Sequence, residues 1–179
     1  MDENTRGSGA EPAREEGEEG QDGGGGCPPA LRRALAAHTT LTLAYTDEDG
    51  PQACAVLYAP VDGPVPALVF VTADSTRHGR ALAACGPAGA RVACTAQKDG
   101  QEWTELTGVQ GRGVCRRLEG ARRAAGWQAY TGRFPFVTAD ARLGAALERT
   151  ALWELRLDWL RLIDNGQGFG HKEEWHQRG

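Results

Sequence analysis

Long apolar runs are missing from this sequence. No stretch among its 179 residues approaches the roughly 20 apolar residues that a membrane-spanning helix needs, and the first residues lack the basic-then-apolar order of a secretory signal. We therefore expect a cytoplasmic protein with no membrane partner. Lysine is also scarce, because Lys98 and Lys172 are the only two, and the arginines are scattered over several segments. A nucleic-acid surface needs a dense basic stripe, so a nucleic-acid partner is not expected.

Paired cysteines are missing as well. The five cysteines are an odd number, are widely spaced and include no Cys-x-x-Cys pair, and no histidine cluster accompanies them. We expect reduced, mostly buried thiols and no metal site, with a redox or metal role as the alternative. The sequence also lacks a P-loop, a dinucleotide-binding glycine motif and the motifs of a catalytic triad.

Charge is distributed unevenly along the chain. Residues 1–26 hold eight acidic side chains and two arginines, a net charge of −6, so the remaining residues carry +2 of the total of −4. The same segment has eight glycines and almost no apolar side chain, too little to offset the entropy of ordering it. We predict that residues 1–26 are a disordered acidic tail and that residues 27–179 form one domain.

Apolar periodicity predicts the secondary structure of that domain. Residues 28–38 indicate a helix with proline in its first turn and Leu31 and Leu35 on one face. From Thr40 the period changes to two, and a turn at residues 47–50 separates the first two strands. Strands are predicted at residues 40–45, 52–58, 67–71, 91–95, 109–118 and 152–157, and further helices at 77–82, 119–131 and 138–149. Short strands in consecutive hairpins with flanking helices predict a mainly β protein built on an antiparallel barrel.

One strand end leads into a helix start that is dense in hydroxyl and basic groups. The segment is Thr72-Ala-Asp-Ser-Thr76-Arg77-His78-Gly79-Arg80. Free N–H groups at a helix N-terminus, hydroxyls and an arginine together suit a phosphate. A capped helix with solvated arginines fits the same residues.

This segment resembles the FMN-phosphate segment of the pyridoxamine-phosphate-oxidase-like split barrels, in which a strand ends in Thr and is followed by Ser-Arg-Lys-Gly-Arg. The resemblance implies an antiparallel FMN-binding split barrel that works as a homodimer with FMN between its subunits. It also implies which residues bind the phosphate, with one histidine standing where the family has lysine. These residues are Thr72, Thr76, Arg77 and His78.

Later segments extend the resemblance. Gly108-Val-Gln110-Gly, followed by Arg116-Arg-Leu-Glu-Gly120, is similar to one subfamily. The flavin contact that the oxidase has at the position of Thr107-Gly108 is lost here, and Gln110 lies two residues farther on the same face. A glutamine of an edge strand that faces water is the alternative. Three blocks, Arg133–Phe136, Leu152–Asp158 and Asp164–Trp175, occur in the order of a bacterial branch called YhbP-like.

The glycines of the last block predict a ligand contact. Gly168 and Gly170 allow the backbone to approach a ligand closely, and Phe169 and Trp175 could cover a flat ring. A C-terminal segment anchored in a groove by its aromatics is the alternative. Trp153 and Trp159, six residues apart on an alternating strand, are expected in the core or a dimer interface.

The second strand departs from the family. The oxidase has Arg and Lys there for FMN, whereas this chain has Cys54, Ala55, Val56 and Leu57. The resemblance therefore implies that only the backbone of these four residues serves the flavin ring, and oxidation of vitamin B6 is not expected.

We interpret the chain as an FMN-binding protein and a flavin-dependent oxidoreductase whose substrate and catalytic residues stay open. A flavin carrier or sensor without turnover is the first alternative. A haem-binding or haem-degrading barrel with His171 or His176 as axial ligand is the second. A deazaflavin in place of FMN is the third.

Overall fold

The computed structural model describes residues 26–178, so the predicted tail lies outside the described residues apart from Gly26. Residues 86–88, 103–105 and 165–167 form short 3-10 turns. The helices are α1 (Pro29–Ala37), α2 (Arg77–Ala84), α3 (Gly120–Arg133), α4 (Phe136–Ala139) and α5 (Ala141–Glu148). The strands are β1 (Thr40–Asp47), β2 (Gly50–Val61), β3 (Ala67–Val71), β4 (Ala90–Gln97), β5 (Thr107–Arg117), β6 (Leu152–Asp164) and β7 (Lys172–His176).

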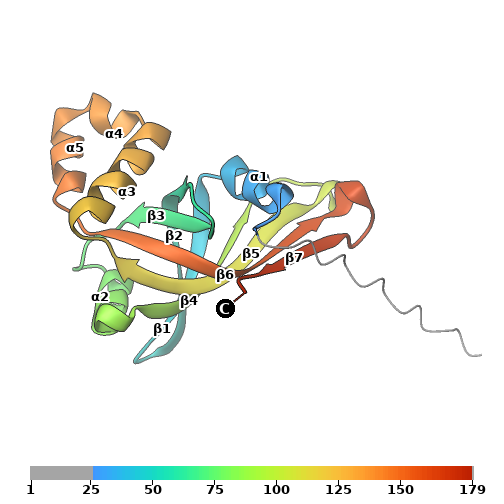
Figure 1. Ribbon diagram of the computed structural model, residues 1–179, viewed down its shortest axis with the longest axis horizontal. Helices are drawn as coiled ribbons and strands as arrows, with labels where there is room; N and C mark the ends of the chain where they lie inside the picture. Colours follow the sequence, from blue (N-terminus) through green and yellow to red (C-terminus); the bar gives the residue numbers. More distant parts are fainter. Residues whose placement is uncertain (1–25, 179) are drawn as a thin grey trace, which may run out of the picture.

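All seven strands form one antiparallel sheet that closes into a barrel. Neighbouring strands follow the order β3-β2-β1-β4-β5-β6-β7, and β3 also pairs with β6. Along one edge of β6, Leu152–Arg156 pair with β3, whereas Trp159–Ile163 pair with β7. The start of β5, the end of β6 and strand β7 therefore extend away from the barrel, on the side opposite to α2 and α3–α5 (Figure 1).

The barrel is open along part of β2. Strand β3 pairs with β2 only at Tyr58–Val61, whereas β1 pairs with β2 from Gly50 to Leu57. The N–H of Tyr58 donates to the Thr39 carbonyl at 3.0 Å, so the peptide groups of even-numbered residues face β1. The peptide groups of Ala53, Ala55 and Leu57 face the other edge, where none of the described strands pairs with them.

Two apolar clusters hold the elements together. Helix α1 packs Leu31 and Leu35 into the barrel core, and the Tyr58 hydroxyl inside that core donates to the Leu35 carbonyl at 2.6 Å. The second cluster lies outside the barrel, where Tyr130 of α3 and Phe134, the residue that ends this helix, pack on buried side chains of the sheet. The two apolar faces of α1 and α3 thus fix each helix to a different side of the sheet.

A β-bulge decides where the two strand tryptophans lie. The pairing of β5 with β6 shifts between Arg112 and Gly113, and Asp158 is left without a partner on β5. Because one extra residue reverses the alternation, Trp153 is buried in the core whereas Trp159 is half-buried on the outer face. A strict period of two would place both tryptophans on the same face of the sheet, and because of the bulge they lie on opposite faces.

The cysteines match the expectation of reduced, mostly buried thiols. Cys27, Cys94 and Cys115 are buried, Cys54 is half-buried and Cys85 is exposed, and all five are free thiols. Burial raises the thiol pKa of Cys27 to about 11 and that of Cys94 to about 12, so neither thiol ionises at neutral pH.

Candidate functional site at the start of helix α2

Three of the predicted phosphate-binding side chains meet where β3 ends. Thr72, the first residue after the strand, is buried, and its backbone N–H donates to the Ala151 carbonyl at 3.1 Å. Its Oγ1 lies 3.1 Å from Oγ1 of Thr76 and 2.5 Å from Nε2 of His78. The corner between β3 and α2 therefore concentrates two hydroxyls and one imidazole, as the sequence predicts.

The backbone of the corner is shaped by a cap and a glycine. Oγ1 of Thr76 accepts from the N–H of Gly79 at 3.0 Å and donates to the Ala73 carbonyl at 2.8 Å. A Cβ on Gly79 would lie 2.1 Å from the Ala73 carbonyl oxygen, so only glycine fits. Among the described residues none accepts from the N–H groups of Arg77 or His78. Two unpaired donors at a helix N-terminus favour an anion there.

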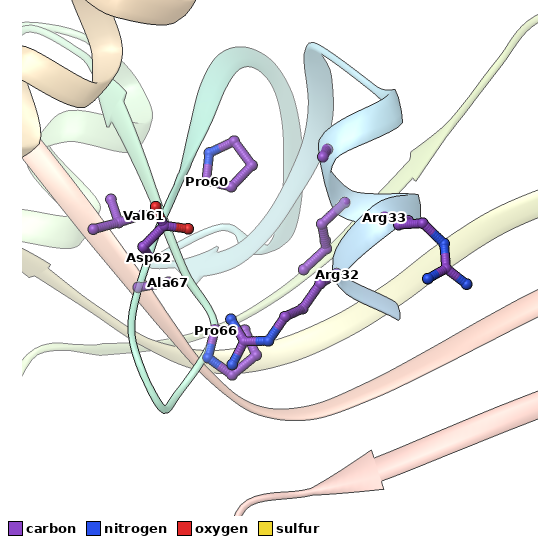
Figure 2. A pocket seen from close by; sticks show the side chains of 9 residues that line it. Arg32, Arg33, Pro60, Val61, Asp62, Pro66 and Ala67 are labelled. Atoms are coloured by element: carbon purple, nitrogen blue, oxygen red, sulfur yellow. The ribbon is translucent and has the colours of Figure 1, made fainter. Parts of the chain in front are cut away.

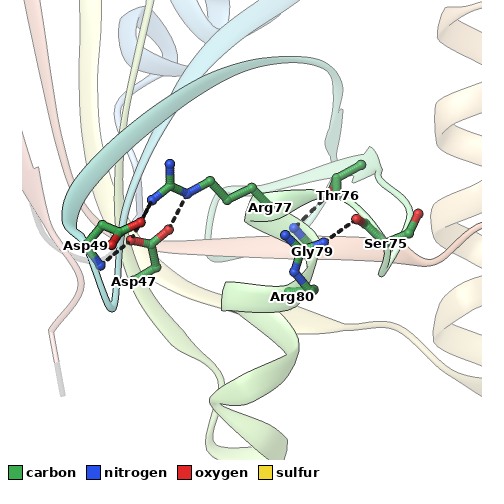
Figure 3. A network of polar contacts seen from close by, with 7 residues as sticks. All are labelled: Asp47, Asp49, Ser75, Thr76, Arg77, Gly79 and Arg80. Atoms are coloured by element: carbon green, nitrogen blue, oxygen red, sulfur yellow. Dashed lines mark hydrogen bonds and ion pairs between the residues drawn. The ribbon is translucent and has the colours of Figure 1, made fainter.

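Arg77 extends away from these hydroxyls, toward the hairpin between β1 and β2 (Figure 3). Its Nε lies 2.7 Å from Oδ2 of Asp47, its Nη2 lies 3.3 Å from Oδ1 of the same residue, and Nη2 also pairs with Asp49. The hydrogen bond from Arg77 holds the pKa of Asp47 below its ordinary value. The sequence does not predict this pair of carboxylates, because residues 47–50 indicate only a turn.

Burial favours the neutral form of His78 in this arrangement. Burial lowers the pKa of its imidazole below the ordinary value of 6.5, and its ring centroid lies 6.3 Å from that of Tyr45 on β1. Burial also raises the pKa values of Tyr45 and of Cys54, its neighbour on β2. The corner thus lies beside the hairpin end of β1 and β2, where the free edge of β2 begins.

The predicted flavin-ring residues on β2 alternate in direction. The side chains of Cys54 and Val56 pack toward the barrel core, whereas Ala55 and Leu57 are exposed on the outer face. The small side chains of Ala53 and Ala55 leave that part of the free edge uncovered. The backbone contact that the resemblance implies is therefore available here.

Gln110 does not lie beside that edge in the same chain. Strand register leads from Ala55 across Thr42 and Thr95 to Gln110, three strand spacings or roughly 14 Å away. It does share the outer face with Ala55, so the sheet carries both residues toward the same side.

The Gly168–Gly170 loop is placed still farther away, in the turn between β6 and β7. Asn165 fixes this turn, because its Nδ2 donates to the Trp103 carbonyl at 2.8 Å and its Oδ1 accepts from the N–H of Gly170 at 3.0 Å. The ring of Phe169, 79% exposed, lies 6.1 Å from that of Trp103. The loop and α2 are at opposite ends of the molecule (Figure 1), so one chain does not bring them together.

A hollow of about 260 Å³ lies between α1 and the loop that joins β2 to β3 (Figure 2). Leu35, Pro60 and Ala67 give it a largely apolar lining. The guanidinium of Arg32 donates to the carbonyls of Gly63 and Pro64 at 2.8 and 3.1 Å. Since its charge is used to hold that loop, the hollow lacks the anion-binding character of the corner, and it includes no residue that the sequence predicted for a site.

The two histidines considered for haem lie on β7 and in the loop before it. Nε2 of His171 lies 3.6 Å from Glu173, and Nε2 of His176 lies 3.7 Å from Glu174. Within residues 26–178 no three His, Cys, Asp or Glu side chains come close enough to hold a metal ion. The same part of the chain has no helix long and apolar enough to span a membrane.

Comparison with known proteins decides the family. No family model matches the chain. The UPF0306 protein YhbP of Salmonella schwarzengrund is 36% identical over 146 residues, which cover 82% of this chain and 90% of that protein. The chain belongs to the UPF0306 YhbP family. The predicted resemblance to the YhbP-like branch is thus confirmed.

Solved structures confirm the fold. A haem-binding protein from Mycobacterium smegmatis superimposes with a TM-score of 0.59 and 27% identity over 82% of this chain and 56% of that longer one. A pyridoxamine 5'-phosphate oxidase-related, FMN-binding protein from Nostoc punctiforme has a TM-score of 0.56 and 12% identity over 83% of this chain and 86% of that one. The predicted antiparallel split barrel is therefore confirmed, among neighbours that bind FMN or haem.

Proposed function

We propose that this member of the UPF0306 family binds FMN at the corner between β3 and α2 and works as a flavin-dependent oxidoreductase. The observation that supports it most is the coincidence of two sets of unpaired hydrogen-bonding groups. The N–H groups of Arg77 and His78 have no acceptor among the described residues, and the adjoining edge of β2 has no partner strand. A phosphate suits the first set, and the polar edge of a flavin ring suits the second.

The residues at the corner fit a phosphate group. The hydroxyls of Thr72 and Thr76 lie 3.1 Å apart. Thr72 can donate to a phosphate beside the two backbone N–H groups, and Thr76 can do so when its hydroxyl turns away from the Ala73 carbonyl. His78 would add charge only when protonated, and Arg77 only after leaving Asp47. The site therefore recognises the phosphate mainly with neutral donors.

The β2 edge accounts for the missing basic pair of the second strand. Peptide groups of Ala53, Ala55 and Leu57 offer donors and acceptors without any side-chain charge, and the exposed methyl groups of the two alanines leave room for a flat ring. When bound, the flavin would carry the electron or hydride chemistry, while the chain orients it and excludes water from one of its faces.

A homodimer completes this proposal. Gln110 and the Gly168–Gly170 loop lie too far from the corner to contact the same flavin within one chain. The outer face of the sheet is exposed and, between Leu57 and the arginines Arg91 and Arg112, has a patch of small, uncharged side chains that offers a flat surface to a second copy. Members of this surface are Thr40, Thr42, Ala53, Ala55, Ala93 and Thr95.

A second candidate is haem binding, because the solved relative with 27% identity is a haem-binding protein. The imidazoles of His171 and His176 both lie near a carboxylate. Such a carboxylate could orient an axial imidazole, but at 3.6 and 3.7 Å neither contact is a hydrogen bond that would fix the ring. FMN therefore remains the first proposal.

Parallel titrations of the protein with FMN, riboflavin and haemin test the choice. FMN should bind more tightly than riboflavin, since only FMN has the phosphate. Thr72→Val removes the buried hydroxyl at nearly constant shape and should weaken FMN about tenfold, the worth of a charge-assisted hydrogen bond, while riboflavin binding changes little. Equal affinity of the two flavins, or tight binding of haemin alone, would contradict the proposal.

A further inference from the structure

The tip of the β1–β2 hairpin carries two carboxylates that hold the arginine of the proposed phosphate site. Asp47 accepts hydrogen bonds from both Nε and Nη2 of Arg77, and Asp49 accepts one from Nη2. We call Asp47 and Asp49 the hairpin carboxylates. The side chain of Asp47 is only 12% exposed, against 71% for Asp49, so the two contacts differ in how strongly water weakens them.

These contacts turn Arg77 away from the place where a phosphate would bind. The side chain of Arg77 runs toward the hairpin, whereas Thr76 and the start of the helix lie at its other end (Figure 3). One guanidinium and two carboxylates give a local charge of −1. Burial favours the neutral form of His78, and Asp74 is paired with Arg117 at 2.8 Å. Arg80 keeps its positive charge but directs its guanidinium to the Ser75 carbonyl, not to the hairpin.

A phosphate at the corner therefore meets a competitor that is part of the same chain. A guanidinium that already donates hydrogen bonds to a carboxylate has fewer N–H groups left for a second anion. A dianion near the tip is also repelled by the excess negative charge there. Riboflavin, which has no phosphate, meets neither obstacle.

We propose that the hairpin carboxylates are specificity-determining residues, which compete with the phosphate of the flavin for Arg77 and so limit the preference for FMN over riboflavin. This inference rests on the proposed function. To add its charge to the neutral donors that bind the phosphate, Arg77 must leave the hairpin, and the hairpin tip is then released.

Charge-neutral variants of the hairpin test the competition. Asn in place of Asp47 keeps the Oδ1 that accepts from the N–H of Asp49 at 3.0 Å, so the turn is preserved. The ratio of the riboflavin Kd to the FMN Kd should rise about two- to fivefold in Asp49→Asn and about tenfold in the double variant Asp47→Asn/Asp49→Asn, given the worth of partly exposed ion pairs. A ratio that is unchanged or lower would overturn the inference, since the carboxylates would then merely orient Arg77.

Glu48→Gln is the matched control. Glu48 lies between the two carboxylates, is exposed, and makes no contact with Arg77 among the described interactions. It removes the same unit of charge from the same turn. In Glu48→Gln the ratio of the riboflavin Kd to the FMN Kd should stay within about twofold of wild type, because a solvated charge is screened. A rise equal to that of the hairpin variants would show a general charge effect and refute competition for Arg77.

Inorganic phosphate separates this inference from the proposed function. If the wild type binds neither flavin, the proposed function fails, and phosphate titration followed by the amide NMR signals of Arg77 and Gly79 still judges the competition. Phosphate should bind several-fold more tightly to the double variant than to wild type, and equal or undetectable binding by both would overturn the inference. If the double variant does not fold, Asp49→Asn alone decides, since its carboxylate is exposed.

Discussion

Gly79→Ala should damage the corner more than any loss of a side-chain contact would suggest. The new Cβ would lie 2.1 Å from the carbonyl oxygen of Ala73, 3.0 Å from its carbonyl carbon and 2.9 Å from Oγ1 of Thr76. Two of these atoms belong to the backbone, so rotation of a side chain cannot relieve the overlap. The segment from Ala73 to Thr76 must move, and the cap on α2 is lost with it.

The size of the effect follows from these two costs. Loss of an N-cap costs about 1 kcal/mol, and forcing atoms into a filled space costs about 1–3 kcal/mol, so the free energy of unfolding should fall by about 2–4 kcal/mol. For a domain of this size the Tm should fall by roughly 4–16 °C. Because the N–H groups of Arg77 and His78 move with the loop, FMN affinity measured well below the Tm should fall at least about tenfold.

Gly132→Ala is the control for this substitution. Gly132 lies in α3, and a Cβ there would meet no atom within 4 Å. Alanine in such a helical position is neutral or stabilising by up to about 1 kcal/mol. Urea denaturation of both variants gives the comparison. If Gly79→Ala is as stable as Gly132→Ala and binds FMN like the wild type, the close approach of Gly79 to Ala73 is not part of the site.

Three further predictions concern charge, pH and packing. Arg77→Ala should weaken FMN binding by about 1–2 kcal/mol. The variant loses a charge-assisted hydrogen bond worth about 1.5–3 kcal/mol, but in the wild type that bond is partly offset because Arg77 must leave the hairpin carboxylates. Riboflavin binding should be unchanged in the same titration. The contribution of His78 to FMN affinity should fall as pH rises through its free-site pKa, which lies below 6.5. The variant His78→Gln should lack that contribution, whereas the FMN phosphate itself titrates in both proteins. Identical pH profiles of FMN affinity for the wild type and this variant would contradict the role of His78. Leu31→Ala should lower the free energy of unfolding by about 2–5 kcal/mol, because Leu31 is fully buried. Leu57→Ala, which changes an exposed side chain, should lower it far less. Similar denaturation midpoints for the two variants would refute the packing of α1 into the barrel.

The barrel was predictable because its signals are local. Leu31 and Leu35 mark α1, and alternating residues mark the strands from β1 onward. The predicted helix at 138–149 is in fact two helices, since the Asp140 side chain accepts from the N–H groups of Arg142 and Leu143 and starts α5 there. Strand β7 was not predicted, because the glycines at 166–170 made the end of the chain resemble a loop.

The candidate site was predictable only where its residues are neighbours in sequence. Thr72, Thr76 and His78 lie within seven residues, so a motif could indicate that they meet. The contact of Arg77 with the hairpin joins residues 28 to 30 positions apart, and no local pattern specifies it. Gln110 and the Gly168–Gly170 loop lie far from the corner within one chain, and only the proposed second copy would bring them to it, which no single-chain pattern specifies.

The visible absorption spectrum of the protein purified without added cofactor, followed by reconstitution with FMN, tests the central claim most directly. We predict a flavin spectrum, weak as purified and complete after FMN is added, with a protein-bound flavin that mass spectrometry identifies as FMN. A haem spectrum, a deazaflavin spectrum, or a protein that stays colourless at saturating FMN would contradict the assignment of an FMN site to the corner between β3 and α2.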